Sequence, residues 1–310
     1  MTTTPKLRIG TRGSPLAMAQ TLEARDLLAA ANAELSTPDA IEVLEIKTTG
    51  DAILDRPLAE VGGKGLFTKE LDVALMDGRV DIAVHSIKDV ETFLPDGVVL
   101  AAFLEREDPR DAFLSLNAPS LAELPAGSVI GSASLRRQAQ ILNRRPDLKV
   151  TLLRGNVQTR LGKLAEGVVD ATLLAYAGLR RLGLEEKISA VLSAEEMLPA
   201  VGQGAIGITC RADDASVLEW LAAVNHTETQ IRVTAERALL AALDGSCRTP
   251  IGGLAEIDGD RLRLRGLVAR EDGSEMFETE RNGALHDAAA LGDDAGRELR
   301  ARAGDDLFED

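Results

Sequence analysis

The sequence predicts an α/β protein with largely parallel sheets, followed by a smaller α+β domain. Short apolar runs alternate with amphipathic stretches over most of the chain, a pattern typical of strands and helices in succession. Beyond the helix that we expect to end near residue 243, the pattern changes to longer strand-like runs and one final helix. The length of 310 residues corresponds to two or three domains at about 150 residues each.

The strands and helices of the α/β part follow one another along the chain. Apolar runs predict strands at residues 7–10, 41–46, 80–84, 98–103, 128–131, 149–153, 171–175 and 205–209. Apolar positions at helical spacing predict helices at residues 15–31, 66–77, 135–145, 157–166 and 177–182. Strands that alternate with helices in this way indicate parallel pairing through crossover connections.

The C-terminal part has a different composition of elements. Residues 228–243 predict one amphipathic helix, with Thr227 and Gln230 as a capping box and Gly245 as its end. The runs LRLRGLV and SEMFETE predict strands, and a last helix follows near 286–303. Together these elements predict an α+β domain of about 80 residues.

Composition and charge exclude several classes of function. The chain has 35 basic and 50 acidic residues, a net charge of −15, which disfavours general binding to nucleic acids or membrane surfaces. Two cysteines and three scattered histidines show no metal-ligand spacing, so we expect no metal site. The N-terminus has no apolar signal region and no run is long enough to span a membrane, which predicts a cytoplasmic protein.

Three predicted strand-to-helix turns carry arginines next to a capping residue. The expected N-caps are Ser14, Ser134 and Asn156. The arginines are Arg12, Arg136, Arg137, Arg154 and Arg160. A helix N-terminus carries partial positive charge, so arginines there oppose the helix dipole, whereas a bound anion would explain them. A basic, solvated surface is the alternative, and the absence of a GxxxxGK[ST] loop disfavours a nucleotide triphosphate.

Two further segments could carry chemistry. Lys88 and Asp89 follow a predicted strand, where a carboxylate can act as acid, base or cation stabiliser, although a surface ion pair is the alternative. Cys247 lies in a Gly-rich turn and is either an accessible nucleophile or an incidental loop cysteine. His85 and Cys210 lie in apolar runs and are expected to be packed in the core.

Residues 48–65 fit neither the strand nor the helix pattern. The segment contains four glycines and one proline, and a loop of this length inside a compact domain is usually functional or disordered. We interpret it as a mobile lid, with a plain flexible loop as the alternative.

Several long motifs, taken together, resemble the porphobilinogen deaminase family. They are IGTRGSPLA, VGGKGLFTKEL, DIAVHSIKDV, LEREDPRDAF, GSASLRRQAQ, LRGNVQTRL, VGQGAIGI and GSCRTPIGG. They occur in the family's order from about residue 8 to residue 253, and the C-terminal part matches weakly in detail. The resemblance implies two α/β domains like those of periplasmic binding proteins, with the active cleft between them, and a third domain that bears the cofactor. On this sequence the domains would be 5–104 with 200–222, 105–199, and 223–310.

The resemblance also implies a reaction and a cofactor. The enzyme would be a transferase of tetrapyrrole biosynthesis that joins four porphobilinogen molecules head to tail, releases ammonia and forms hydroxymethylbilane. A dipyrromethane bound through a thioether to Cys247 would prime the growing polypyrrole chain. The resemblance implies no metal and no nucleotide. We expect a monomer that has neither a nucleic acid nor a membrane as a partner.

Residue roles follow from the same resemblance. Asp89 and Lys88 would be catalytic, with Asp89 stabilising the positive charge that develops when ammonia leaves. The cofactor would be bound by Cys247, Ser134, Arg136, Arg137, Lys88 and Asp89. Carboxylates of the substrate would be bound by Arg12, Ser14, Arg154 and Arg160, with further contacts from Lys64, Phe67 and Gln203.

Three positions depart from the usual family pattern. Glu91 stands where a proline commonly follows the KDV motif, Tyr176 replaces a small residue, and Ala133 replaces a serine. None of these changes removes a predicted charged site residue, and Tyr176 could either narrow the cleft or fill a gap.

Overall fold

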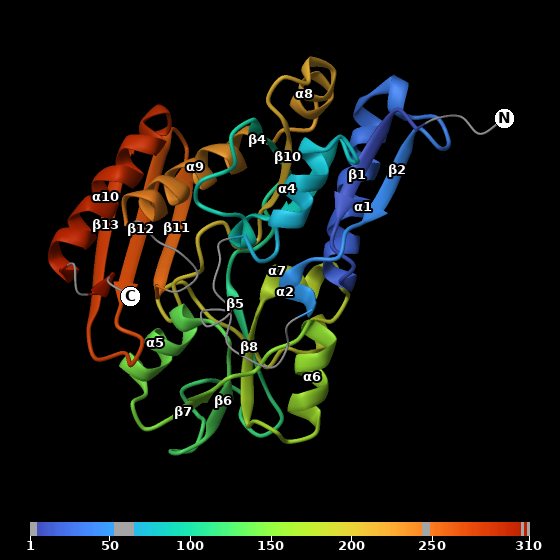
Figure 1. The fold of residues 1–310 in the computed structure, drawn as a ribbon. Coiled ribbons are helices and arrows are strands. Elements are labelled where there is room, and N and C mark those ends of the chain that lie inside the picture. The colour runs from blue at the N-terminus through green and yellow to red at the C-terminus, as the bar shows by residue number, and fades with distance from the viewer. Residues whose placement is uncertain (1–4, 53–64, 244–248, 305–306, 309–310) are drawn as a thin grey trace. The chain divides into compact units, whose positions relative to one another are not determined.

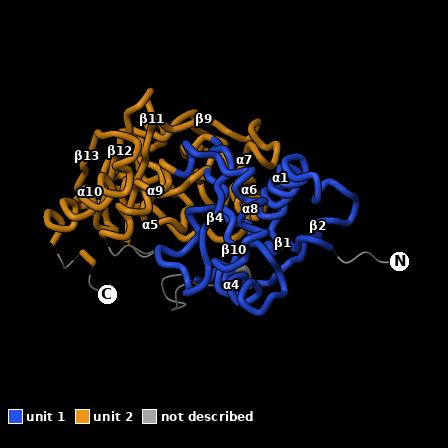
Figure 2. Tube along the Cα trace, turned by 90° about the horizontal axis from the view of Figure 1, so that it is seen from above, with its two compact units in different colours: residues 1–53, 62–107, 205–230 blue, residues 54–61, 108–204, 231–310 orange. Residues whose placement is uncertain are grey.

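The computed structural model describes residues 5–52, 65–243, 249–304 and 307–308. The chain divides into two compact units (Figure 2). Unit 1 comprises residues 1–53, 62–107 and 205–230, and unit 2 comprises residues 54–61, 108–204 and 231–310.

Unit 1 is built on a five-stranded sheet in the order β2-β1-β3-β10-β4 (Figure 1). Its strands are β1 (Leu7–Thr11), β2 (Ile41–Glu45), β3 (Ile82–Ser86), β4 (Val98–Phe103) and β10 (Ile206–Arg211). Strands β2 and β3 pair in parallel with β1, whereas β10 is antiparallel to both β3 and β4. Strands β1 to β4 therefore run in one direction, and β10, the last strand of this sheet in the sequence, runs in the opposite direction.

Helices and short turns complete unit 1. They are α1 (Pro15–Ala31), η1 (Ala33–Leu35), α2 (Thr49–Ala52), α4 (Lys69–Met76), η2 (Ile87–Asp89) and α8 (Ala215–Ala222). Helix α1 begins as predicted, because the Ser14 hydroxyl accepts a hydrogen bond from the Ala17 N–H at 3.2 Å and Pro15 occupies the first turn. The sheet and the helices α1 and α8 share one apolar core, in which Cys210 is buried as expected.

Unit 2 contains a second five-stranded sheet in the order β7-β6-β8-β5-β9. Its strands are β5 (Asp111–Ser115), β6 (Val129–Gly131), β7 (Lys149–Thr151), β8 (Ala171–Ala175) and β9 (Ala190–Val191). The helical elements are α5 (Leu135–Arg144), α6 (Val157–Ala165), α7 (Tyr176–Arg181) and η3 (Glu185–Lys187). Here β6 pairs in parallel with β7 and β8, and β5 is antiparallel to β8 and β9.

The C-terminal part of unit 2 is an antiparallel sheet with helices on one face. The elements are α9 (Thr227–Ala242), β11 (Ile251–Asp258), β12 (Arg261–Ala269), β13 (Met276–Ala284), η4 (Leu285–Asp287) and α10 (Ala288–Ala303). Helices α9 and α10 share the apolar core that covers this sheet (Figure 1). The two helices approach closely at Gly292 of α10, which has no side chain. A Cβ atom there would lie 2.2 Å from the Ala235 carbonyl oxygen of α9.

These sheets confirm the predicted fold class, two α/β domains and a smaller C-terminal α+β domain. The predicted helices and strands are present within a few residues of their expected bounds, whereas the strands β5, β9 and β11 and the helices α2 and α8 were not predicted. The boundaries of three separate domains stay a prediction. The predicted helix end at Gly245 and most of the predicted lid lie outside the described residues.

One predicted helix cap is wrong. Helix α9 begins at Thr227 itself, and its first turn is capped by His226, whose Nδ1 accepts a hydrogen bond from the Thr229 N–H at 3.2 Å. The Gln230 side chain accepts a hydrogen bond from Asn225 at 2.8 Å instead of closing a capping box. The ring nitrogen of a histidine offers the same acceptor as the hydroxyl of a threonine, so the cap is shifted by one residue.

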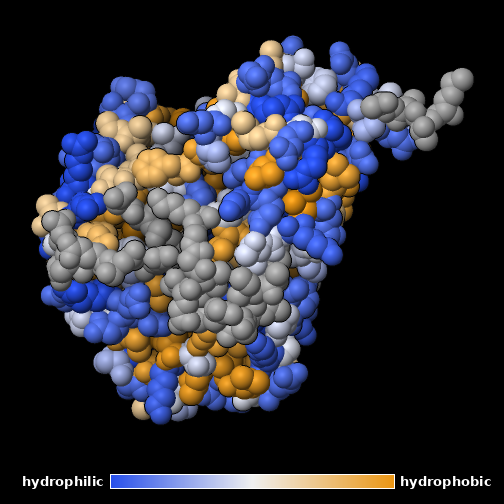
Figure 3. Space-filling view, viewed as in Figure 1, coloured by the Kyte–Doolittle hydropathy of each residue, from blue (hydrophilic) through white to orange (hydrophobic). Residues whose placement is uncertain are grey.

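Large apolar side chains are exposed at a few positions of unit 2, namely Leu116, Leu152 and Val168. Figure 3 shows apolar side chains on the part of the surface that carries β6, β8 and α6. Isolated exposed apolar residues are normal on soluble domains, so we assign no function to them. None of the helices that the structure describes is long and apolar enough to cross a membrane.

Candidate functional site

The main candidate site lies where two parallel strands of unit 1 end. Strands β1 and β3 are neighbours in the sheet, so the segments that follow them meet at the same edge. Arg12 follows β1 and precedes the N-terminus of α1, and Asp89 ends the short turn η2 after β3. The chain therefore brings an arginine, a carboxylate and a helix N-terminus together, although Arg12 and Asp89 are far apart in sequence.

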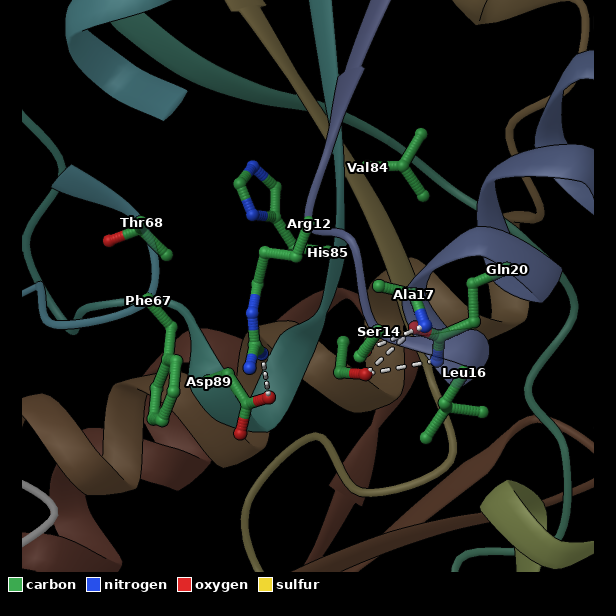
Figure 4. A pocket seen from close by; sticks show the side chains of 11 residues that line it. Arg12, Ser14, Leu16, Ala17, Gln20, Phe67, Thr68, Val84, His85 and Asp89 are labelled. Atoms are coloured by element: carbon green, nitrogen blue, oxygen red, sulfur yellow. Dashed lines mark hydrogen bonds and ion pairs between the residues drawn. The ribbon is translucent and has the colours of Figure 1, made fainter. Parts of the chain in front are cut away.

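Arg12 is held between an aromatic ring and a carboxylate (Figure 4). Its guanidinium carbon lies 4.1 Å from the centre of the Phe67 ring, and its Nη1 lies 3.5 Å from an Asp89 oxygen. The Asp89 side chain is 33% exposed and that of Arg12 is 20% exposed. The contact is thus a loose ion pair over an aromatic face, and a third of the Asp89 side chain is open to solvent.

Apart from Arg12 and Asp89, this pocket is lined by a mixture of uncharged polar and apolar side chains. It is lined by Arg12, Ser14, Leu16, Ala17, Gln20, Phe67, Thr68, Val84, His85, Ser86 and Asp89. Gln20 and Ser86 hydrogen-bond each other at 2.9 Å, and His85 Nε2 is 2.9 Å from the Thr209 hydroxyl. Burial, and then the charge of Arg12, lower the pKa of His85 to about 4. His85 is therefore packed as expected and neutral at neutral pH, which leaves Arg12 as the cation of the pocket lining.

A second cluster lies in unit 2, where α5 begins after β6. Arg136 and Arg137 are both buried, and each forms an ion pair with Asp111 of β5, at 2.8 Å and 2.6 Å. Each arginine also donates to a backbone carbonyl, Arg136 to that of Leu198 and Arg137 to that of Leu173, both at 2.7 Å. The predicted anion-binding arginines are thus held inside the domain by internal acceptors.

Asp111 is a site residue that the sequence analysis did not single out. Burial acts to raise the pKa of Asp111, but the charges of Arg136 and Arg137 outweigh it, so its pKa lies well below the ordinary value. Gln203, which was predicted to bind substrate, donates to Asp111 at 3.0 Å and to the Pro109 carbonyl at 2.7 Å. Asp111 lies in the LEREDPRDAF motif, but its strand was not predicted, so no local pattern placed it beside the arginines.

The charges of this cluster do not cancel. Two guanidiniums face one carboxylate, and Nε of Arg136 is buried without a hydrogen-bond partner among the described residues. A buried donor and an excess positive charge are the features expected where an anionic group binds. The cluster therefore suits a ligand that carries carboxylates.

The third arginine turn, at the start of α6, has its predicted cap. The Asn156 side chain accepts a hydrogen bond from the Thr159 N–H at 2.9 Å. Arg160 donates to the Gly155 carbonyl at 2.8 Å, and Lys163 donates to the carbonyl of the buried Arg154 at 3.2 Å. Two basic side chains of α6 thus hold the loop before this helix in place.

The remaining predicted residues have different outcomes. Ser134 caps α5 as expected, accepting from the Arg137 N–H at 3.4 Å. Lys88 lies in η2 next to Asp89 and is partly buried. Tyr176 packs partly buried against the unit 2 core with its hydroxyl 3.4 Å from Glu185, so it fills space on its own domain. Cys247 and Lys64 lie outside the described residues.

No group of three or more histidine, cysteine, aspartate or glutamate side chains could hold a metal ion within the described ranges. The charged groups of both clusters are arginines and single aspartates. Their chemistry is therefore the binding of anions and the stabilisation of positive charge by a carboxylate.

Comparisons with known proteins give a consistent family. Residues 7–219 match the family described as porphobilinogen deaminase, dipyromethane cofactor binding domain, and residues 230–301 match the porphobilinogen deaminase C-terminal domain. The chain is 58% identical to a chloroplastic porphobilinogen deaminase of Oryza sativa subsp. japonica, over 98% of this chain and 86% of that protein. It is 58% identical to the porphobilinogen deaminase of Nitrobacter hamburgensis, over 97% of this chain and 94% of that protein.

Solved structures show more distant similarity. The methionine binding protein MetQ is 14% identical, with a TM-score of 0.45 over 72% of this chain and 91% of that chain. A periplasmic substrate-binding protein of an ABC transporter from Coxiella burnetii is 13% identical, with a TM-score of 0.43 over 72% of this chain and 94% of that chain.

Proposed function

The chain belongs to the porphobilinogen deaminase family, and we propose that the pocket at Arg12 and Asp89 is where its substrate reacts. The protein is a transferase that polymerises porphobilinogen to hydroxymethylbilane with release of ammonia, and its cofactor is dipyrromethane. The observation that carries the proposal is the loose contact of 3.5 Å between Arg12 and the partly exposed carboxylate of Asp89. A monomeric state and a cytoplasmic location are part of the same proposal.

Arg12 and the N-terminus of α1 bind the acidic side chains of the substrate. Each porphobilinogen carries an acetate and a propionate, so every added unit brings two carboxylates that need cationic partners. The guanidinium of Arg12 is held flat on Phe67, and a planar guanidinium matches a carboxylate with two parallel hydrogen bonds. Ser14 caps the adjacent helix and orients its free N–H groups beside the same pocket.

Asp89 stabilises positive charge on the reacting pyrrole. When ammonia leaves, the methylene carbon and the pyrrole nitrogen become electron-poor, and a nearby carboxylate lowers the energy of that state. An oxygen at 3.5 Å from Arg12, instead of in a close bidentate pair, keeps the capacity to accept a hydrogen bond from a pyrrole N–H. Lys88, next in the chain, supplies a further cation for the carboxylates.

The buried cluster in unit 2 suits the dipyrromethane cofactor, which carries carboxylates of its own. Arg136 and Arg137 would bind these carboxylates with Ser134, supported by the unpartnered Nε of Arg136 and the excess positive charge beside Asp111. Gln203 would hold Asp111 in place from its other side. When bound, the cofactor supplies the pyrrole carbon to which the first substrate unit is joined, and we assign its covalent attachment to Cys247.

Arg154 and Arg160, with Lys64, are proposed to bind the carboxylates of later substrate units. The loop before α6 is fixed by bonds from Arg160 and Lys163 to its own carbonyls, so the Arg160 side chain and the backbone of Arg154 are held in place in unit 2. Ordered cations bind anions at lower entropic cost than freely moving ones.

The proposal for the pocket is tested by Asp89→Ala. We expect the variant to fold like the parent and to lose turnover by about 10²–10³-fold, the range typical of losing one stabilising group at a developing charge. Asp96→Ala, which removes an exposed aspartate from the same connection, is the matched control and should keep its activity. Turnover is measured by the ammonia released, and parental activity in Asp89→Ala would refute the role of this carboxylate.

The assignment of the cofactor to Cys247 is tested by intact mass under denaturing conditions. The parent protein should carry an excess mass equal to two deaminated porphobilinogen units, located on a peptide that contains Cys247. Cys247→Ala should show the unmodified mass, and Cys210→Ala, which alters a buried thiol of unit 1, should keep the excess. Covalently bound cofactor in Cys247→Ala would overturn the assignment.

A further inference from the structure

The ring of Phe67, which contacts the guanidinium of Arg12, also packs against the backbone at Gly50. A Cβ atom at Gly50 would lie 2.4 Å from the Phe67 ring, so a side chain at position 50 would displace the ring. The Gly50 N–H donates to the Leu66 carbonyl at 2.7 Å, next to Phe67 in the chain. The ring is therefore in close contact with both the backbone of α2 at Gly50 and the guanidinium of Arg12.

The turn that presents Phe67 is tied to the Asp89 segment by one carboxylate. Glu91 accepts a hydrogen bond from the Gly65 N–H through its side chain. Gly65 has a φ of +74°, and its carbonyl accepts from the N–H groups of Thr68 and Lys69 at 3.0 and 2.8 Å, which begins α4. The carboxylate of Glu91 thus fixes the residue on which this turn is built.

The contacts form a closed ring of four side chains and short backbone links. Phe67 lies two residues after Gly65, and Glu91 lies two residues after Asp89. Phe67 touches Arg12, Arg12 pairs with Asp89, and Glu91 returns to Gly65. Without the hydrogen bond from Gly65 to Glu91, the turn that carries Phe67 is no longer joined to the segment that carries Asp89 by this contact.

We propose that Glu91 is a positioning residue for the reaction, which keeps Phe67 under Arg12 and thereby Arg12 beside Asp89. A residue without a side-chain acceptor at position 91, such as proline or alanine, could not accept from the Gly65 N–H. The chain therefore holds its substrate-binding arginine through a contact that depends on the Glu91 carboxylate. The inference rests on the proposed function, because it gives Glu91 a role only if Arg12 binds the substrate.

The first test compares the steady-state kinetics of Glu91→Ala and Glu91→Gln. An aromatic contact to a cation is worth a few-fold in affinity, so Glu91→Ala should raise KM for porphobilinogen about three- to tenfold and leave kcat within about twofold. Glu91→Gln keeps an acceptor oxygen and should have the parental KM. Glu219→Ala, an exposed glutamate on α8 of the same unit, is the matched control and should not change either constant.

A double-mutant comparison separates positioning from a general loss of structure. In a Phe67→Ala background, Glu91→Ala should raise KM no further, because Glu91 acts through the ring. An independent, multiplicative effect of the two changes would overturn the proposal, as would a parental KM in Glu91→Ala or an equal defect in Glu91→Gln. Should Glu91→Ala fail to fold, Glu91→Asp, one methylene shorter, replaces it in the same comparison.

Arg12→Met distinguishes failure of this inference from failure of the proposed function. If Arg12→Met raises KM while Glu91→Ala does not, Arg12 binds substrate and only the positioning role of Glu91 is refuted. If Arg12→Met leaves KM unchanged, the substrate role of Arg12 is refuted, and the positioning role of Glu91 is refuted with it.

Discussion

In unit 1 a single arginine faces a single aspartate, whereas in unit 2 two arginines share one. Both groups lie where a helix begins after a strand, next to a serine cap. The unit 1 pair is 3.5 Å apart with 20% and 33% of its side chains exposed, and the unit 2 pairs are 2.8 Å or closer with at most 6% exposed. The same residue types at the same kind of turn thus produce one open contact and one closed network.

The difference in burial predicts which aspartate stabilises the fold and which one can contact a ligand. A buried carboxylate with two close guanidiniums is held by their charges and closed to solvent, so Asp111 orients Arg136 and Arg137 and does not react. A partly exposed carboxylate in a loose pair, such as Asp89, keeps acceptor capacity for a ligand. From geometry alone, we therefore expect Asp111 variants to change stability and Asp89 variants to change turnover.

The largest effect on stability is expected for Asp111→Ala. Removing this carboxylate leaves two buried guanidiniums without their counter-charge, a change that typically costs about 3–5 kcal/mol of unfolding free energy. Urea unfolding followed by far-UV circular dichroism measures the loss.

The control for Asp111 is Asp147→Ala, which breaks an ion pair with Arg145 on the surface of the same unit. Exposed pairs contribute little, so the midpoint of unfolding should not move measurably. If Asp111→Ala were as stable as Asp147→Ala, the contrast between a closed and an open group would be lost.

Two buried aspartates, Asp72 and Asp111, have pKa values that are shifted in opposite directions. Within the described ranges no ion pair involves Asp72 of α4, and burial, followed by the charge of Glu91, raises the pKa of Asp72 to about 6. Asp111 has two arginines and its pKa is lowered. The fold therefore favours protonated Asp72 and ionised Asp111, and the two groups affect stability in different pH ranges.

The sign of the Asp72 effect follows from this raised pKa. The folded state holds the proton more tightly than the unfolded chain, so the contribution of Asp72 to stability is most favourable below pH 4 and falls as the pH rises to about 6. Asp72→Asn removes this dependence, and should be more stable than the parent by roughly 2–3 kcal/mol at pH 7 and equal to it at pH 4. Unfolding midpoints at the two pH values measure the difference.

Asp77→Asn, an exposed aspartate at the end of the same helix, is the control for Asp72→Asn and should show no such gain at pH 7. Equal stability of Asp72→Asn and the parent at pH 7 would mean that Asp72 is not held in a desolvated site.

Local features of the fold were predictable from the sequence, and long-range pairings were not. Ser14, Ser134 and Asn156 cap their helices as expected, because a cap depends on residues within one turn. The partner of Arg137 is Asp111, 26 residues away on a strand that was missed. No local pattern distinguishes an arginine that binds an internal aspartate from one that faces a ligand.

The pocket of unit 1 was predicted in its charged residues but not in its construction. Arg12, Ser14, Phe67 and Asp89 do come together. The roles of Gly50 behind the ring and of Glu91 on Gly65 depend on α2 and on the turn before α4, which the sequence analysis had treated as part of one loop. A glycine required by a neighbouring ring looks in sequence like any other loop glycine.

The smallest effects are expected for the two serine caps, where the open and closed groups should behave alike. Ser14→Ala and Ser134→Ala each remove one acceptor from a helix N-terminus and should each lower the unfolding free energy by about 1 kcal/mol. Glycine is tolerated at this position, so Ser14→Gly and Ser134→Gly should lose only a few tenths of that amount, roughly 0.3 kcal/mol. Urea unfolding of the four variants measures these losses. A loss at Ser14 several times that at Ser134 would show that Ser14 holds the open pocket together as well as capping its helix, and the loose geometry around Arg12 would then depend on more than the contacts with Phe67 and Asp89.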